Sequence, residues 1–140
     1  MSTTHDSRQQ QLVDDFSLFG DWSERYQYLI DLGRQLPPLP ERERTETHRV
    51  EGCQSQVWLL SAGDRERLHF RAGSDSTIVA GLLALLLKVY SDRSAQEILD
   101  TPPDFIRAIG LDKHLSMTRN NGLSAVLARM REVAAQALAS

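Results

Sequence analysis

The chain has 140 residues, of which 41% are hydrophobic and 25% are charged, proportions that are ordinary for a globular protein. This length predicts one compact domain over residues 1–140, with a core large enough to need no disulfide. The net charge of −3 supplies no basic field, so nucleic acid is not an expected partner. The single cysteine excludes an internal disulfide and a metal centre built from several thiolates.

The beginning of the chain and its longest apolar run both favour a cytoplasmic protein. Residues 1–7 are polar and are expected to be frayed, and no apolar segment typical of a secretory signal follows them. The longest apolar run, residues 78–87, has about half the length of a membrane span. We therefore expect no membrane partner, and a reducing compartment in which the cysteine stays a free thiol.

Two amphipathic helices are predicted in the first quarter of the chain, over residues 8–20 and 21–36. Apolar side chains recur at helical spacing in both: Leu12, Phe16 and Phe19 in the first, and Trp22, Tyr26, Leu29, Ile30 and Leu36 in the second. Asp21 and Glu24 have the spacing of a capping box, which predicts the start of the second helix. The prolines in residues 37–40 end it, because proline lacks the amide proton.

A charged connector and a β-hairpin are expected next. Residues 41–49 carry charges without periodicity, which is typical of a solvated connector; contact with a partner is the alternative. Strands are predicted over 56–61 and 67–72, where residue types favour extended structure and the second segment alternates apolar and polar residues. Residues 62–66 have turn chemistry, and a short extended piece near 48–50 suggests a third strand.

The second half of the chain is predicted to be helical. Helices are expected within residues 74–90, 94–100, 101–110 and 118–139. The first of these begins with Ser74 and Asp75, which are good capping types, and its nearly continuous apolar character predicts cover on most sides. Ser94 and Glu97 form a second capping-box pattern. The predicted fold class is therefore α+β, with a small antiparallel sheet of about three strands packed against helices.

Cys53, in the stretch VEGCQSQVWLL, is the candidate reactive residue. The thiolate of a cysteine is strongly nucleophilic when it is ionised and accessible. Gly52 lets the backbone turn sharply and leaves room for a reactant, while Gln54 and Ser55 can donate hydrogen bonds to a sulfur anion. The alternative is a cysteine that serves only as a small buried apolar residue.

The sequence gives only weak evidence for any other arrangement of catalytic residues. His114 could act as a base, but nothing in the sequence brings it to Cys53. The remaining histidines show no metal-ligand spacing: His5, His48 and His69. No glycine-rich phosphate loop is present, so neither a metal nor a cofactor is expected.

Four separated stretches resemble the SufE family in order and spacing. They are GCQSQVWL (52–59), LGRQLPPLP (32–40), SDSTIVAGLLALLL (74–87) and HLSMTRNNGL (114–123), and the resemblance spans about residues 10–138. The residues after the cysteine favour SufE over its close relative CsdE. Met117 departs from the pattern, because relatives commonly carry proline there; we expect this to affect the start of the last helix rather than the thiol chemistry.

The resemblance implies sulfur transfer in iron–sulfur cluster assembly. A SufS-type cysteine desulfurase, which carries the pyridoxal phosphate, would hold sulfur from L-cysteine as a persulfide. Cys53 would take this sulfur as its own persulfide, stimulate desulfurase turnover and pass the sulfur to a SufBCD-type scaffold. The chain would thus act as the partner of an enzyme and would not itself be an autonomous enzyme. It would have no cofactor of its own. The resemblance also implies an IscU-like fold and a tendency to form homodimers.

The resemblance singles out further residues around the thiol. Asp75 and Arg119 match positions near the thiol loop or on the surface that faces the desulfurase. Arg119 could hold positive charge near a persulfide anion, or it could be an ordinary surface arginine at the start of a helix. Trp58 also matches the motif and is expected in the core.

Two functional alternatives stay open. The chain could activate a desulfurase without covalent contact, and Cys53→Ser separates this from a relay, because only a relay loses its stimulation of turnover. A one-cysteine peroxidase is the third hypothesis, but the sequence shows no base and arginine constellation around the thiol.

Overall fold

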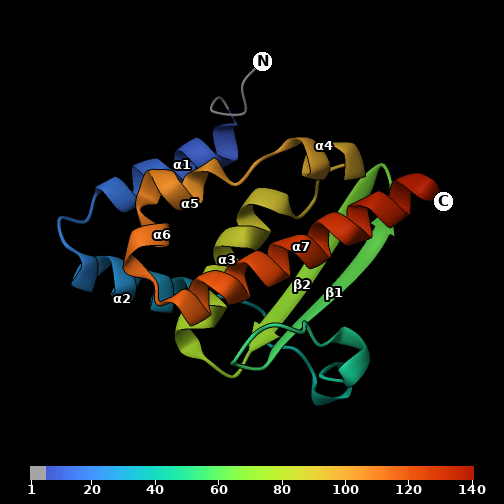
Figure 1. Cartoon of the computed structure of the whole chain (residues 1–140), viewed down its shortest axis with the longest axis horizontal. Helices are drawn as coiled ribbons and strands as arrows, with labels where there is room; N and C mark the ends of the chain where they lie inside the picture. Colours follow the sequence, from blue (N-terminus) through green and yellow to red (C-terminus); the bar gives the residue numbers. More distant parts are fainter. Residues whose placement is uncertain (1–5) are drawn as a thin grey trace.

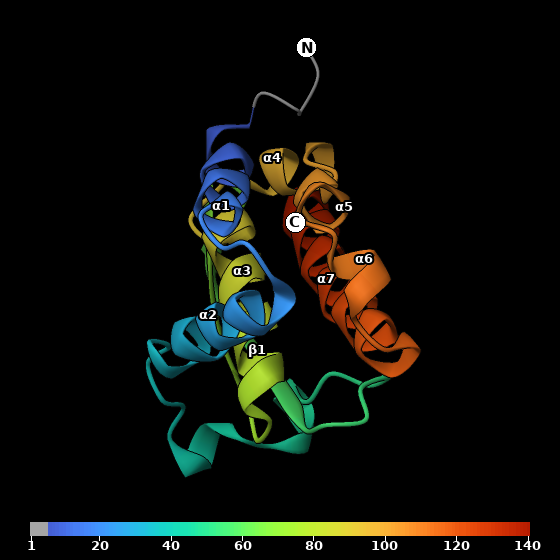
Figure 2. The ribbon, with the colours of Figure 1, turned by 90° about the vertical axis from the view of Figure 1, so that its left-hand side faces the viewer.

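The hairpin and the helices pack into two layers, with a small antiparallel sheet against a group of helices (Figures 1 and 2). The computed structural model describes residues 6–140. The strands are β1, Val57–Asp64, and β2, Arg67–Ser74. The helices are α1 (Ser7–Ser17), α2 (Trp22–Arg34), α3 (Thr77–Tyr90), α4 (Ala95–Asp100), α5 (Asp104–Ile109), α6 (Leu111–His114) and α7 (Met117–Ala139), and two short 3₁₀ turns cover Glu41–Glu43 and Glu46–His48. The predicted α+β class is confirmed.

The sheet has two strands among the described residues, so the expected number of about three was too high. The extended piece predicted near residues 48–50 contributes only an isolated bridge between Arg49 and Trp58. Pairing stops there because the chain leaves the sheet edge at Gly52, whose φ of +90° belongs to the left-handed region. One further backbone hydrogen bond, from Val50 N to Val57 O at 2.9 Å, closes the loop that results.

The hairpin is longer than predicted, and its turn is shorter. Asp64 pairs with Arg67, so only Arg65 and Glu66 lie between the strands. The carboxylate of Asp64 accepts hydrogen bonds from the amides of Glu66 and Arg67 at 2.9 and 3.3 Å, which stabilises this tight turn. The turn chemistry of residues 62–66 was therefore identified correctly, but the strands extend into it.

Side-chain caps set most of the helix starts. Asp21 accepts a hydrogen bond from the amide of Glu24, and Ser94 and Glu97 form a complete capping box, as predicted. Helix α3 is capped by Ser76, two residues after the expected Ser74. Helix α7 begins with Met117, which occupies the first helical position, where proline is well tolerated.

At the N-terminal end, the structure differs from the prediction in two segments. Helix α1 ends at Ser17 rather than near Gly20, because the amide of Leu18 bonds to Asp15 O and closes the last turn. Of the segment expected to be frayed, residues 1–5 lie outside the described residues. Asp6 is ion-paired and the helix begins directly after it.

Helix α3 lies at the centre of the core, as its continuous apolar sequence predicts. It contacts α2, β2 and α7. The contact with α2 is backbone to backbone: a side chain at Gly33 would come within 2.7 Å of Gly81 N, and one at Gly81 within 2.2 Å of Leu29 O. Only glycine allows this close approach, which brings the two helices together under the sheet.

Leu39 and the connector that follows it cover one end of the outer face of the sheet. Trp58 and Leu60 form a small cluster with Leu39, so Trp58 is a core residue, as expected. The guanidinium of Arg44 lies 5.4 Å from the centre of the Trp58 ring. Most side chains of residues 41–49 are exposed, but the segment packs on the sheet in addition to linking two elements. Within the described residues, no helix is long and apolar enough to cross a membrane.

Candidate functional site

Residues 50–57 form a loop with Cys53 near its middle, and both ends of this loop are fixed to the sheet. The bond from Val50 N to Val57 O closes its base. At its C-terminal end, Gln56 N donates to the carboxylate of Asp75 at 3.0 Å, and Gln56 O accepts from the hydroxyl of Ser74 at 2.7 Å. The hairpin thus gives the cysteine loop a rigid attachment.

The middle of the loop rests on α7 (Figure 2). A side chain at Gly52 would meet the methyl group of Ala125 at 3.3 Å, so the absent side chain and the positive φ both suit glycine here. The half-buried Cys53 thiol donates a weak hydrogen bond to the carbonyl oxygen of Gly122, with Sγ and O 3.6 Å apart. Contacts with small residues therefore hold the loop against the helix.

Cys53 lines a cavity of about 280 Å³ between the loop, α3 and α7. Its apolar lining comes from Val57, Val79, Leu82, Leu83, Leu86, Leu123 and Val126. Polar groups of Gln54, Ser55, Ser116, Thr118 and Arg119 complete it. The site is therefore an apolar hollow bordered by hydrogen-bonding groups and one guanidinium, with a single thiol in its wall.

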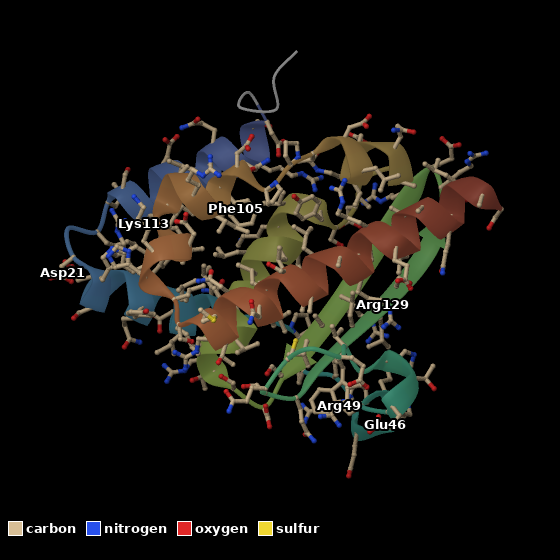
Figure 3. The ribbon with its side chains drawn as sticks, viewed as in Figure 1. Asp21, Glu46, Arg49, Phe105, Lys113 and Arg129 are labelled. Atoms are coloured by element: carbon tan, nitrogen blue, oxygen red, sulfur yellow. The ribbon has the colours of Figure 1, made fainter. Side chains whose placement is uncertain are left out.

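The surroundings of Cys53 favour the protonated thiol. Burial raises its pKa; Arg49 acts in the opposite direction, and the carboxylate of Glu51 raises the pKa further. Arg49 also forms an ion pair with Glu46, at 3.4 Å. Figure 3 shows Arg49 and Glu46 on the connector, with Arg129 above them on α7. The thiol is therefore mostly uncharged at neutral pH in the free protein.

The structure brings together most of the candidate residues. Gln54, Ser55 and Arg119 line the same cavity as Cys53. Gly52 shapes the loop. Asp75 does not line the cavity: its carboxylate instead fixes the end of the loop through Gln56.

None of the described histidines lines the cavity. The ring of His114 stacks on Trp22 with ring centres 3.9 Å apart, and its Nδ1 lies 3.0 Å from Gly110 O. His69 pairs with Asp92 at 2.8 Å. His5 lies outside the described residues, and within them no group of three or more histidine, cysteine or acidic side chains could hold a metal ion.

Sequence reasoning missed the helix surface on which the loop rests. Gly122 and Ala125 contact the loop from a helix about 70 residues further along the chain, so no local pattern links them to it. One signal was available: an isolated glycine inside a strongly helical pattern destabilises the helix relative to alanine, which draws attention to its position.

Comparisons with known proteins agree with this picture. Residues 10–134 match the family described as "SufE: Fe-S metabolism associated domain". An uncharacterized SufE-like protein of Rhizobium meliloti is 43% identical over 129 residues, covering 89% of this chain and 92% of the relative. Another from Rhizobium etli is 45% identical over 130 residues, covering 89% and 87%.

A solved structure also matches the whole fold. The solution structure of a hypothetical protein from Thermus thermophilus superposes with a TM-score of 0.77 at 24% identity, covering 95% of this chain and 97% of that one. This structural similarity supports the assignment of the fold and carries no conclusion about function. The match over residues 10–134 and the two relatives show that the chain belongs to the SufE family, which is associated with iron–sulfur metabolism.

Proposed function

We propose that this protein accepts sulfur from a SufS-type cysteine desulfurase on Cys53, as a persulfide, and passes it to a SufBCD-type scaffold for iron–sulfur cluster assembly. One observation carries the proposal: the only cysteine of a SufE-family chain lines a largely apolar cavity at the middle of an anchored loop. Pyridoxal phosphate would stay with the desulfurase, so this chain needs no cofactor for its step.

The transfer itself is a thiol exchange. The Cys53 thiolate attacks the outer sulfur of a persulfide on the desulfurase, and a new S–S bond forms. The old S–S bond breaks, and its electron pair leaves with the desulfurase sulfur as a thiolate. The outer sulfur keeps its proton, and neither an oxidant nor a reductant is consumed. One thiol is therefore sufficient, which fits a chain with a single cysteine.

The cavity suits a sulfur-loaded cysteine. A water molecule occupies about 30 Å³ of the liquid, so a hollow of about 280 Å³ has ample room for one more sulfur atom. Its apolar lining would keep dissolved thiols away from the persulfide. Arg119, at the start of α7, would supply positive charge to a persulfide anion or to the docking desulfurase.

Docking must expose the thiol and favour its ionisation. The ends of the loop are held by main-chain and carboxylate hydrogen bonds, whereas Cys53 itself has one weak bond to a carbonyl. A desulfurase could therefore draw the middle of the loop outward while the hairpin stays intact. The low thiolate fraction of the free protein would limit unwanted reactions before docking.

Intact-mass analysis tests the proposal. The protein is incubated with a cysteine desulfurase that contains pyridoxal phosphate, together with L-cysteine. We expect a gain of about 32 Da, one sulfur atom, on wild type and none on Cys53→Ser. Cys53→Ser should also lose its stimulation of desulfurase turnover. If Cys53→Ser still stimulates turnover and wild type gains no sulfur, the protein is a non-covalent activator instead.

A further inference from the structure

One face of α7 forms a wall of the cysteine cavity. The lining residues recur at helical spacing from the N-cap onward: Ser116, Thr118, Arg119, Gly122, Leu123 and Val126. Gly122 alone among them has no side chain, although it lies well inside a helix of 23 residues. Glycine destabilises a helix interior relative to alanine, so its presence here calls for a packing reason.

The neighbour of Gly122 on this side is Cys53. A Cβ atom at Gly122 would lie 3.6 Å from Cys53 Sγ and 3.9 Å from Cys53 Cβ. These are ordinary van der Waals distances, so Gly122→Ala leaves the position of the bare thiol unchanged. The added methyl group would, however, fill the space between the sulfur and the helix. The bare thiol does not need this space.

We propose that Gly122 is a specificity-determining residue for the sulfur-loaded form of Cys53. This inference rests on the proposed function. An S–S bond is about 2 Å long, so the outer sulfur reaches well beyond Sγ. The space beside Gly122 lets this outer sulfur lie under α7, shielded from solvent. In Gly122→Ala a methyl group already touches Sγ and takes up this space, so the outer sulfur is displaced from its place under α7 to a more accessible position.

Chemical loading gives a direct test. Inorganic polysulfide is added to the full chain; the Cys53 thiolate attacks one of its sulfur atoms, and the shortened polysulfide leaves with the electron pair. After removal of the reagent, glutathione is added and the loaded fraction is followed by intact mass. We expect Gly122→Ala to lose its sulfur at least about threefold faster than wild type, because access controls the reaction.

Two controls separate shielding from general disruption. Ser124→Ala changes an exposed residue of the same helix and should keep the wild-type lifetime. Gly122→Ala itself should keep the wild-type alkylation rate of the unloaded thiol and a melting temperature no lower than that of wild type. Equal sulfur lifetimes in wild type and Gly122→Ala would overturn the proposal, as would faster alkylation of the unloaded thiol with a lower melting temperature.

The test is independent of the desulfurase. If wild type takes no sulfur from a desulfurase, the proposed relay fails, yet polysulfide loading still compares the two lifetimes. If the desulfurase loads both proteins and their lifetimes are equal, the relay stands and only the role of Gly122 is refuted.

Discussion

Cys53 combines a nucleophilic atom with surroundings that keep it uncharged. Burial raises the pKa of its thiol, and two nearby charges act in opposite directions, Arg49 lowering it and Glu51 raising it. Because the thiolate is the reactive form, the free protein holds this thiol in a less reactive state. Activation must then come from a change of environment, which a docked partner could provide.

These opposing effects on the pKa of Cys53 predict how the rate of Cys53 alkylation depends on pH. A raised pKa leaves fewer thiolates at a given pH, so the iodoacetamide rate should rise with a midpoint above about 8.5, the usual pKa of a free cysteine. Arg49→Ala removes a charge that lowers the pKa, so its midpoint should lie higher still, and that of Glu51→Gln lower. Rates from about pH 6 to pH 10 measure these midpoints.

An arginine that does not contribute to the pKa of Cys53 provides the control for this measurement. Arg129 donates to Thr47 O from α7, and Arg129→Ala should leave the midpoint unchanged. A wild-type midpoint at or below that of free cysteine under the same conditions would show that burial does not govern the thiol. A shift in Arg129→Ala as large as that in Arg49→Ala would show that the effect is not local.

Among the elements, the cysteine loop and the strand after it differ in how they are held. Residues 57–60 are buried and lie in the ladder between β1 and β2, whereas residues 51–55 lie outside it. Only the ends of the loop are fixed by hydrogen bonds to the hairpin and its flank. A loop of this kind can move while its strand stays paired.

Hydrogen exchange should reveal this difference. We expect amides 51–55 to exchange at least about tenfold faster than amides 57–60, because the loop can open without unfolding the hairpin. Amides of the central helix α3 serve as the reference for global unfolding. Protection of 51–55 equal to that of 57–60 would contradict a loop that moves Cys53 outward.

The elements themselves were predictable because local signals encode them. Caps such as Ser94 with Glu97 and the apolar run of α3 specify helices without any knowledge of the fold. The prediction of a third strand was wrong, because residue types that favour extended structure do not distinguish a strand from a single β-bridge. The contact between Cys53 and Gly122 was not predictable from local sequence patterns, because 69 positions of sequence separate the two residues.

At the scale of the whole molecule, buried and half-buried polar contacts connect α1 to segments far along the chain. Arg8 donates to Ser91 O at 2.6 Å and to Asp92 O at 3.2 Å, which satisfies carbonyls just beyond the end of α3. The buried Gln9 side chain donates to Pro102 O at 3.0 Å and accepts from Phe105 N at 2.8 Å. Figure 1 shows these elements at the edge of the molecule opposite the loop that precedes β1.

The ion pair between Asp6 and Arg93 completes this attachment. Its nitrogen and oxygen are 2.5 Å apart, and the side chains are only 11% and 10% exposed. Arg93 also donates to the hydroxyl of Thr101 at 3.3 Å. No sequence pattern indicates this pair, since Asp6 lies in a polar segment that was expected to be frayed. Long-range pairing thus extends the ordered core to the start of α1.

Arg93→Met should therefore destabilise the protein by roughly 3 kcal/mol, because it leaves the Asp6 carboxylate buried without its partner. Arg67 gives the matched control: its pair with Asp92 is 3.5 Å long and its side chain is 73% exposed, so Arg67→Met should cost less than about 0.5 kcal/mol. Urea unfolding followed by tryptophan fluorescence measures both. Equal losses in the two variants would refute the structural role of the buried pair, whereas polysulfide loading of folded Arg93→Met should match wild type.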